Sequence, residues 1–110
     1  MKKAGIIRCL QTEDMCSGTT DFVCARDGKG AFAETGPVEV VGFVTCGGCP
    51  GKRAVPRARM MIERGAEIVV LSSCMSKGNP IQYPCPHFQA IREAVEKALA
   101  GKAVLIDWTH

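Results

Sequence analysis

Residues 38–51 read VEVVGFVTCGGCPG, and this stretch decides the fold. Its first part, residues 38–45, is a Val-rich apolar run, which is typical of a strand covered on both faces in a parallel sheet. Cys46 and Cys49 follow with two glycines between them, and a Pro-Gly pair then turns the chain. A strand that runs directly into a cysteine pair predicts functional side chains at the carboxyl end of that strand.

Three other apolar runs rich in Val and Ile complete the expected sheet. With the run above, the strands are expected at residues 4–8, 38–45, 67–73 and 103–107. Helices are expected between successive strands, at residues 21–26, 52–64 and 88–99. The order βαβαβαβ, joined by right-handed crossovers, predicts the α/β class. We expect a small doubly wound, mostly parallel four-stranded sheet with helices on both faces.

The helices differ in how clearly the sequence marks them. The one at residues 88–99 has apolar residues at helical spacing and polar residues on the opposite face. These apolar positions are Phe88, Ile91, Val95 and Leu99. The short helix at residues 21–26 follows a Ser-Gly-Thr-Thr turn, so we expect Thr19 or Thr20 to cap its first amides.

The size and composition of the chain suit one globular domain. It has 110 residues, 46% of them hydrophobic, so we expect a single α/β domain over residues 1–110. The formal net charge of +3 falls short of the dense basic stripe typical of nucleic-acid binding, and no nucleic-acid partner is expected. No apolar run could span a bilayer and no signal-peptide pattern is present. We therefore expect a cytoplasmic protein with no membrane partner.

The seven cysteines are the most informative part of the composition. An odd number excludes a complete set of intramolecular disulfides. In a reducing compartment, cysteines favour metal ligation or thiol chemistry over disulfide scaffolding. Burial as small apolar side chains can account for one or two of them, but not for a Cys-x-x-Cys pair flanked by Gly and Pro.

The expected sheet gathers the cysteines at one edge. Cys9, Cys46 and Cys74 each follow a strand, and residues 107–110 follow the last strand, so all lie at the carboxyl edge, where open α/β sheets bind ligands. The doubly wound order predicts that Cys9 and Cys74 are neighbours, with the Cys46–Cys49 loop within reach. Cys85 and His87, two residues apart before the last helix, are expected to join them.

The residues alone leave three chemistries open. A subset of Cys46, Cys49, Cys74, Cys85 and His87 could hold zinc, in a closed structural site or in an open catalytic one. Cys9 with Cys46, Cys49 and Cys74 could instead hold an iron–sulfur cluster. A thiol–disulfide enzyme would use Cys46 as the attacking thiol and Cys49 as the resolving one. Besides a metal ion, a small molecule or a protein stays open as a partner.

His110 is a further candidate, because the last strand ends at the cysteine edge. Trp108 can hold this segment in place by burying its ring, and a neutral imidazole could then reach the cysteines as a ligand or a general base.

Four short motifs occur together in this chain: Cys46-Gly47-Gly48-Cys49-Pro50-Gly51, Ser73-Cys74, Pro84-Cys85-Pro86-His87 and Thr109-His110. On these motifs the chain resembles the CGGC domain family, and the resemblance extends from the first strand to the last residue. It implies a cysteine-rich metal-binding protein with zinc as the expected ion. It does not fix the ligand set or the cellular role.

Overall fold

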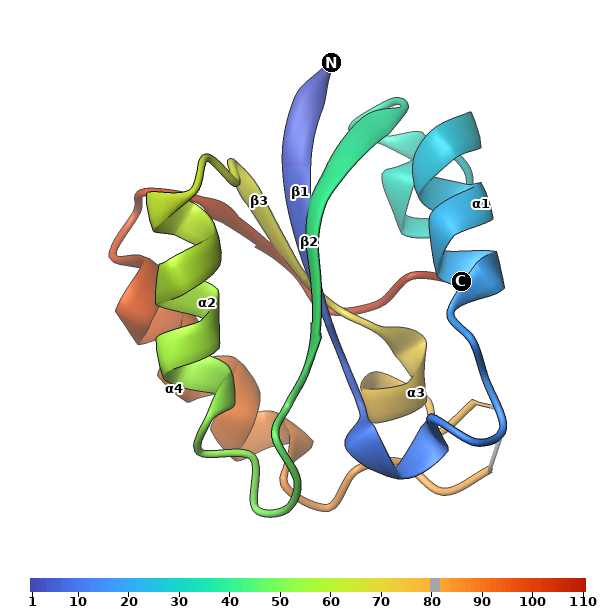
Figure 1. Ribbon diagram of the computed structural model, residues 1–110, viewed down its shortest axis with the longest axis vertical. Coiled ribbons are helices and arrows are strands. Elements are labelled where there is room, and N and C mark those ends of the chain that lie inside the picture. The colour runs from blue at the N-terminus through green and yellow to red at the C-terminus, as the bar shows by residue number, and fades with distance from the viewer. Residues whose placement is uncertain (80–81) are drawn as a thin grey trace.

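The computed structural model describes residues 1–79 and 82–110. Its four strands are β1 (Lys2–Arg8), β2 (Val38–Thr45), β3 (Ile68–Leu71) and β4 (Val104–Ile106). They form one sheet in the order β2-β1-β3-β4, and all three pairings are parallel (Figure 1). The predicted α/β class and doubly wound order are therefore confirmed.

Helices cover both faces of this sheet. The α-helices are α1 (Thr19–Asp27), α2 (Ala54–Glu63), α3 (Ser73–Ser76) and α4 (Phe88–Leu99). Two short 3-10 segments, η1 (Leu10–Thr12) and η2 (Gly30–Ala33), lie in the connection from β1 to β2. Figure 1 shows α1 on one side of the sheet and α2 with α4 on the other. The sheet therefore separates two apolar cores.

Side-chain alternation along the strands fills these two cores. In β1, Ile7 packs in the core with α2 and α4, whereas Ile6 packs in the core with α1. Both side chains have no exposed surface. Burying a side chain of this size stabilises the fold by about 1.5–3 kcal/mol, so both faces contribute to stability.

One local feature brings α2 close to the sheet. Gly5 of β1 pairs with Gly42 of β2, next to a register irregularity between Ala4 and Gly5. A Cβ on Gly5 would lie 2.5 Å from Met61 Sδ, and one on Gly42 would lie 2.9 Å from the same atom. The two glycines thus leave the space that the Met61 side chain of α2 fills.

The structure differs from the expected elements at several boundaries. α1 begins earlier, at Thr19, with Gly18 at the N-cap in a left-handed conformation (φ 85°) and no side-chain cap. The expected cap by Thr19 or Thr20 is therefore wrong; Thr19 Oγ1 instead lies 2.6 Å from Ser17 Oγ. β3 ends at Leu71, so Cys74 lies in α3 and not at a strand end. α2 begins at Ala54.

A search for membrane-spanning segments found no helix of sufficient length and apolar character among residues 1–79 and 82–110.

Candidate metal centre

The loops that carry most of the cysteines meet at the carboxyl edge of the sheet. Figure 1 shows η1, α3, the turn after β2 and the segment before α4 together at the bottom of the molecule. All seven cysteines are free thiols. Cys9, Cys46 and Cys74 are buried in the core with α2 and α4, and Cys85 packs against this core. Four thiols from four segments therefore share one side of the edge.

Cys9 and Cys74 are neighbours, as expected from the strand order. The Cys9 amide donates a hydrogen bond to Cys74 Sγ at 3.2 Å, and Ser72 Oγ lies 2.9 Å from the same sulfur. Burial raises the pKa of the Cys9 thiol, and negative charge on Cys74 and Cys46 would raise it further, against hydrogen bonds from the Gln11 and Thr12 amides. Both sulfurs therefore have polar contacts, and burial favours the protonated thiol at Cys9.

The turn after β2 carries Cys46 and Cys49. The Cys46 amide donates to Arg8 O at 2.8 Å, which continues the pairing of β1 with β2 by one residue. Gly47 and Gly48 then have φ of 84° and 98°, a conformation that other residues rarely adopt. The turn places Cys46 in the core, 5% exposed, and leaves Cys49 exposed to solvent.

Basic side chains surround this turn. Arg57 of α2 donates from Nη1 to Thr45 O at 2.9 Å and to Thr45 Oγ1 at 3.0 Å. The aliphatic stem of Arg53 packs so closely on Gly47 that a Cβ there would lie 2.7 Å from Arg53 Cβ. Neither arginine forms an ion pair within the described part of the chain. Their positive charge is available to stabilise thiolates at this edge.

Cys85 approaches from the segment before α4. Its amide donates to Met75 O at 2.9 Å, which fastens the segment to α3. Burial raises the pKa of the Cys85 thiol, and negative charge on Cys49, Cys46 or Cys74 would raise it further, against a hydrogen bond from the His87 amide. Cys85 also packs against the core that contains Cys46 and Cys74.

Within residues 1–79 and 82–110, no group of three or more Cys, His, Asp or Glu side chains is arranged closely enough to hold a metal ion. The thiols share an edge but do not form a closed site. Cys49 is exposed and Cys85 is half-buried, while Cys46 and Cys74 are buried. Thiolates are ligands for soft and borderline metal ions, and binding of such an ion would require the two outer thiols to approach the two inner ones.

His87 occupies the N-cap position of α4 and is one of the residues that line a small cavity between α2 and α4. Its carbonyl accepts the Ile91 amide at 2.9 Å, as a residue at a helix start does. The imidazole has no hydrogen-bond partner among the residues that the structure describes. His87 is thus close to Cys85 in the chain, and it lines the α2–α4 cavity.

His110 lies on the other face of the sheet. Its Nε2 is 3.4 Å from Asp21 Oδ1 in α1, and its carbonyl accepts hydrogen bonds from Ser73 Oγ at 3.1 Å and Lys77 Nζ at 3.0 Å. Trp108 is half-buried, and Lys77 Nζ lies 4.4 Å from the centroid of its ring. The last residues are therefore well anchored, with the imidazole directed to a carboxylate.

The two remaining cysteines lie apart from this group. Cys24 is in α1 and belongs to the other core, with 7% of its surface exposed. The Cys16 carbonyl accepts a hydrogen bond from Arg8, which lies at the end of β1. The structure thus places five of the seven cysteines at the candidate site.

Sequence reasoning missed the serines that position Cys74. Ser73 has no exposed surface and joins α3 to the last residues of the chain. Its Oγ accepts the Thr109 amide at 2.9 Å and the His110 amide at 3.0 Å, and its own amide donates to Thr109 Oγ1 at 3.1 Å. The only signal in the sequence is a Ser-Ser pair directly after an apolar run.

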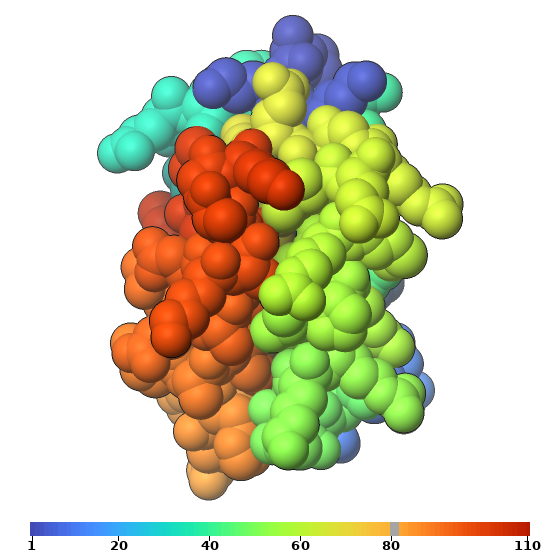
Figure 2. Space-filling model, turned by 90° about the vertical axis from the view of Figure 1, so that its left-hand side faces the viewer, coloured from blue at the N-terminus to red at the C-terminus, as the bar shows by residue number. Residues whose placement is uncertain are grey.

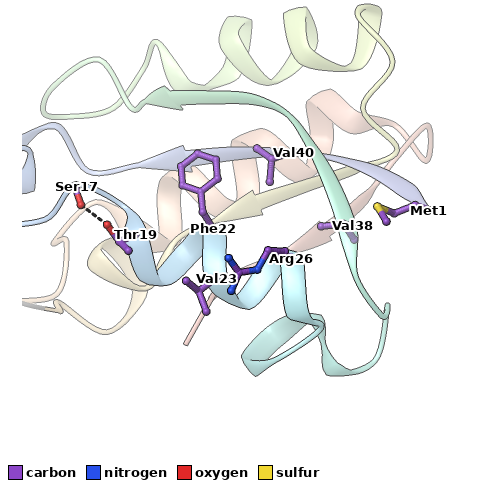
Figure 3. A pocket seen from close by; sticks show the side chains of 8 residues that line it. All are labelled: Met1, Ser17, Thr19, Phe22, Val23, Arg26, Val38 and Val40. Atoms are coloured by element: carbon purple, nitrogen blue, oxygen red, sulfur yellow. Dashed lines mark hydrogen bonds between the residues drawn. The ribbon is translucent and has the colours of Figure 1, made fainter.

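A second cavity lies elsewhere, beside α1 and the edge strand β2. Figure 3 shows Phe22, Val23 and Arg26 of α1 on one side and Val38 and Val40 of β2 on the other. It has a volume of about 590 Å³, and no Cys or His lines it. It is therefore separate from the cysteine edge.

Comparison with known proteins agrees with the cysteine pattern. A family model of the CGGC domain matches residues 3–110. An uncharacterized protein of Methanocaldococcus jannaschii is 34% identical over 91 residues, which cover 77% of this chain and 68% of the relative. A second uncharacterized protein of that organism is 33% identical over 63 residues, covering 56% of this chain and 89% of the relative. No solved structure matches the chain. The chain belongs to the CGGC domain family.

Proposed function

We propose that the protein binds one zinc ion at the carboxyl edge of its sheet through Cys46, Cys49, Cys74 and Cys85. The observation that carries this proposal is that Cys85 packs against the cluster that buries Cys46 and Cys74, while Cys49 lies in the same turn as Cys46. Four thiolates are a ligand set that structural zinc sites use. A reducing compartment such as the cytoplasm would keep these thiols available.

The surroundings of the four thiols support a charged metal site. Zinc with four thiolates carries a net negative charge, which is costly to bury without compensation. Arg53 and Arg57 lie beside the Cys46–Cys49 turn, and the Cys9 amide and Ser72 hydroxyl contact Cys74 Sγ. Cys9 would then act through its backbone on Cys74. The two histidines expected from the sequence are not part of the proposed ligand set. His87 lines the α2–α4 cavity, and His110 Nε2 lies near Asp21 Oδ1.

Metal content decides the proposal. Protein purified under reducing conditions, with neither added metal nor chelator, should contain about one zinc ion per chain by mass spectrometry of the elements. Replacing Cys46, Cys49, Cys74 or Cys85 by Ser should weaken zinc binding more than about a hundredfold, beyond the usual effect of residues that only support a ligand.

Cys24→Ala is the matched control, because Cys24 is buried in the other core and should keep full zinc affinity. Loss of zinc in this control, or full affinity in all four ligand variants, would contradict the proposal. Iron with acid-labile sulfide and a brown colour would instead indicate the iron–sulfur alternative.

Thiol–disulfide exchange is the second candidate function. The solvent exposure of the two cysteines in the Cys46–Cys49 turn favours a version in which Cys49 attacks first. Cys49 is exposed and Cys46 is buried, so an external disulfide can reach only Cys49 directly. The Cys49 thiolate would attack the disulfide, releasing one thiol and forming a mixed disulfide. Cys46 would then attack Cys49 Sγ, releasing the second thiol and leaving a Cys46–Cys49 disulfide. This reverses the roles expected from the sequence.

The two candidate functions differ in what Cys74 does. In disulfide exchange, Cys74→Ser should keep most of the activity, because Cys46 and Cys49 suffice. In zinc binding, the same change removes a ligand. Protein that contains no metal and shows a reversible Cys46–Cys49 disulfide would favour exchange.

A further inference from the structure

A small cavity lies in the groove between α2 and α4, next to both outer cysteines. It has a volume of about 300 Å³, at the lower end of the range for small-molecule sites. One wall is formed by residues that follow Cys49 in the chain, including Pro50, Gly51 and Val55. The other wall is formed by residues that follow Cys85 in the chain, beginning with His87. Figure 2 shows the face on which α2 (green) and α4 (orange) lie side by side.

The walls of this groove are apolar and small. Ala90 and Ala94 stand one turn apart on α4 and are exposed, while Ile91 closes the floor and is buried. Gly51 packs against Ile91 so tightly that a Cβ would clash with the Ile91 side chain. The groove therefore has a fixed floor and room for an apolar group between the two alanines and Val55.

The polar groups at this groove favour a negative charge. Lys52 is the only charged residue among those that line it, and it is exposed. Within residues 1–79 and 82–110, Lys52 forms no ion pair. The imidazole of His87 offers an N–H donor in either protonation state. By contrast, Arg26 in the larger cavity beside α1 is already paired with Asp27 at 2.8 Å.

We propose that the α2–α4 groove binds a small amphiphilic anion, with its apolar chain between Val55, Ala90 and Ala94 and its acidic group at Lys52 and His87. The site would place the acidic end of the ligand beside the loops that carry Cys49 and Cys85. It is independent of the metal proposal, because none of its lining residues is a proposed zinc ligand.

Octanoate, octanol and octylammonium are matched probes for this groove, because they share a chain and differ in charge. Titrated into ¹⁵N-labelled protein, octanoate should shift the backbone resonances of Gly51, Val55, Ala90 and Ala94. It should bind about fivefold more tightly than octanol, because one favourable exposed charge contact is worth up to about 1 kcal/mol. Octylammonium should bind more weakly than octanol.

Two variants separate charge from shape. Lys52→Glu should weaken octanoate binding about tenfold or more and improve octylammonium binding, since it replaces attraction by repulsion. Ala94→Phe should fill the groove and abolish binding of all three probes. Lys29→Glu makes the same change in net charge at a distant exposed position and should leave the affinities unchanged.

Three results would overturn the proposal. They are shifts that map to the cavity beside α1, equal affinities for octanoate and octylammonium, and octanoate binding that survives Ala94→Phe.

Discussion

On the α2–α4 face of the sheet the carboxyl edge is built from thiols, whereas on the α1 face it is built from charged and hydroxyl groups. Successive residues at the end of β1 divide the two: Cys9 packs toward α2 and α4, and Arg8 lies over the ring of Phe43 on the α1 side. Arg8 is 6% exposed and Asp21, also on the α1 side, is 4% exposed.

The difference shows that one sheet edge can gather buried thiols on one face and buried charged side chains on the other. Arg8 donates from Nη2 to Thr12 Oγ1 and to the Cys16 carbonyl, so its charge is held by neutral acceptors. Asp21 Oδ1 has no hydrogen-bond partner in the part of the chain that the structure describes, and His110 Nε2 lies 3.4 Å from it. We therefore expect the thiol side to respond to metal and the α1 side to respond mainly to changes in its own polar contacts.

The largest effect is expected where the thiol side is closely packed. In Gly51→Ala, the alanine would have to keep the left-handed backbone (φ 84°), and its Cβ would clash with the Ile91 side chain. We therefore expect the change to destabilise the fold by about 2–5 kcal/mol. Because Cys46 Cβ lies 4.0 Å from the added atom, zinc affinity should fall as well. Urea denaturation and chelator competition measure the two effects.

Gly36→Ala is the control for Gly51→Ala. Gly36 has a similar φ of 75°, but nothing lies within 4 Å of the added Cβ, so the cost should be about 1 kcal/mol. Equal costs at the two positions would show that backbone strain alone matters at Gly51.

The next effect concerns Ser73, which ties the α3 turn to the last residues of the chain. Ser73→Ala leaves the amides of Thr109 and His110 without their acceptor and should destabilise the fold by about 2–3 kcal/mol. Zinc affinity should also fall, because Cys74 is the next residue. Ser76→Ala in the same helix is the control and should be neutral, since Ser76 Oγ is buried with no partner among the described residues.

A change on the α1 side should separate stability from metal binding. Arg8→Met keeps much of the packing volume but removes the hydrogen bonds to Thr12 and Cys16, so the fold should lose about 2 kcal/mol. Zinc affinity should stay within about threefold of the unchanged protein, because a side-chain change on this face leaves the thiol contacts in place. A loss of zinc as large as that in Cys74→Ser would show that the two sides are coupled.

The smallest effect is a dependence of stability on alkaline pH. Burial raises the pKa of Cys9, Cys85 and Cys24 above 9.0 in the folded protein. Folding then favours the protonated thiols, so their contribution is complete below the unfolded pKa and is lost as pH rises through the folded values. The melting temperature of metal-free protein should therefore fall from about pH 9 upward.

Zinc and Cys24→Ala should each remove a different part of this pH dependence. Zinc removes the part due to Cys85, since a ligated sulfur has already lost its proton. Cys24→Ala removes the part from the other core, with or without metal. If zinc leaves the pH dependence of the melting temperature unchanged, the result would argue against Cys85 as a ligand.

The sheet and main helices could be predicted because their signals are periodic and local. The strands β1 and β2 contain continuous apolar stretches, and α4 was expected with the same first and last residues. The α1 cap failed for a local reason that spacing does not encode: Ser17 and Thr19 hydroxyls bond to each other, and Gly18 takes the left-handed N-cap position. Helix α3 is only four residues long, which is too short for a helical period of apolar residues to show in the sequence.

At the site, the expected topology predicted which cysteines come together, but it did not predict where the two histidines lie. The neighbourhood of Cys9 and Cys74 follows from adjacent strands alone, and the hydrogen bond between them confirms it. The pairing of His110 with Asp21 depends on how α1 is placed over the sheet, which no spacing in the sequence reports. For the same reason, the α2–α4 groove that His87 lines could not be foreseen from the chain.

The contact between Met61 and the glycine pair of β1 and β2 has a consequence for how the family can diverge. Gly5 and Gly42 face one another across the two strands, and the thioether of Met61 fills the notch that they leave. Any side chain at either glycine would displace that sulfur. Among relatives, positions 5, 42 and 61 should therefore change together, with a smaller residue at 61 wherever a glycine is lost.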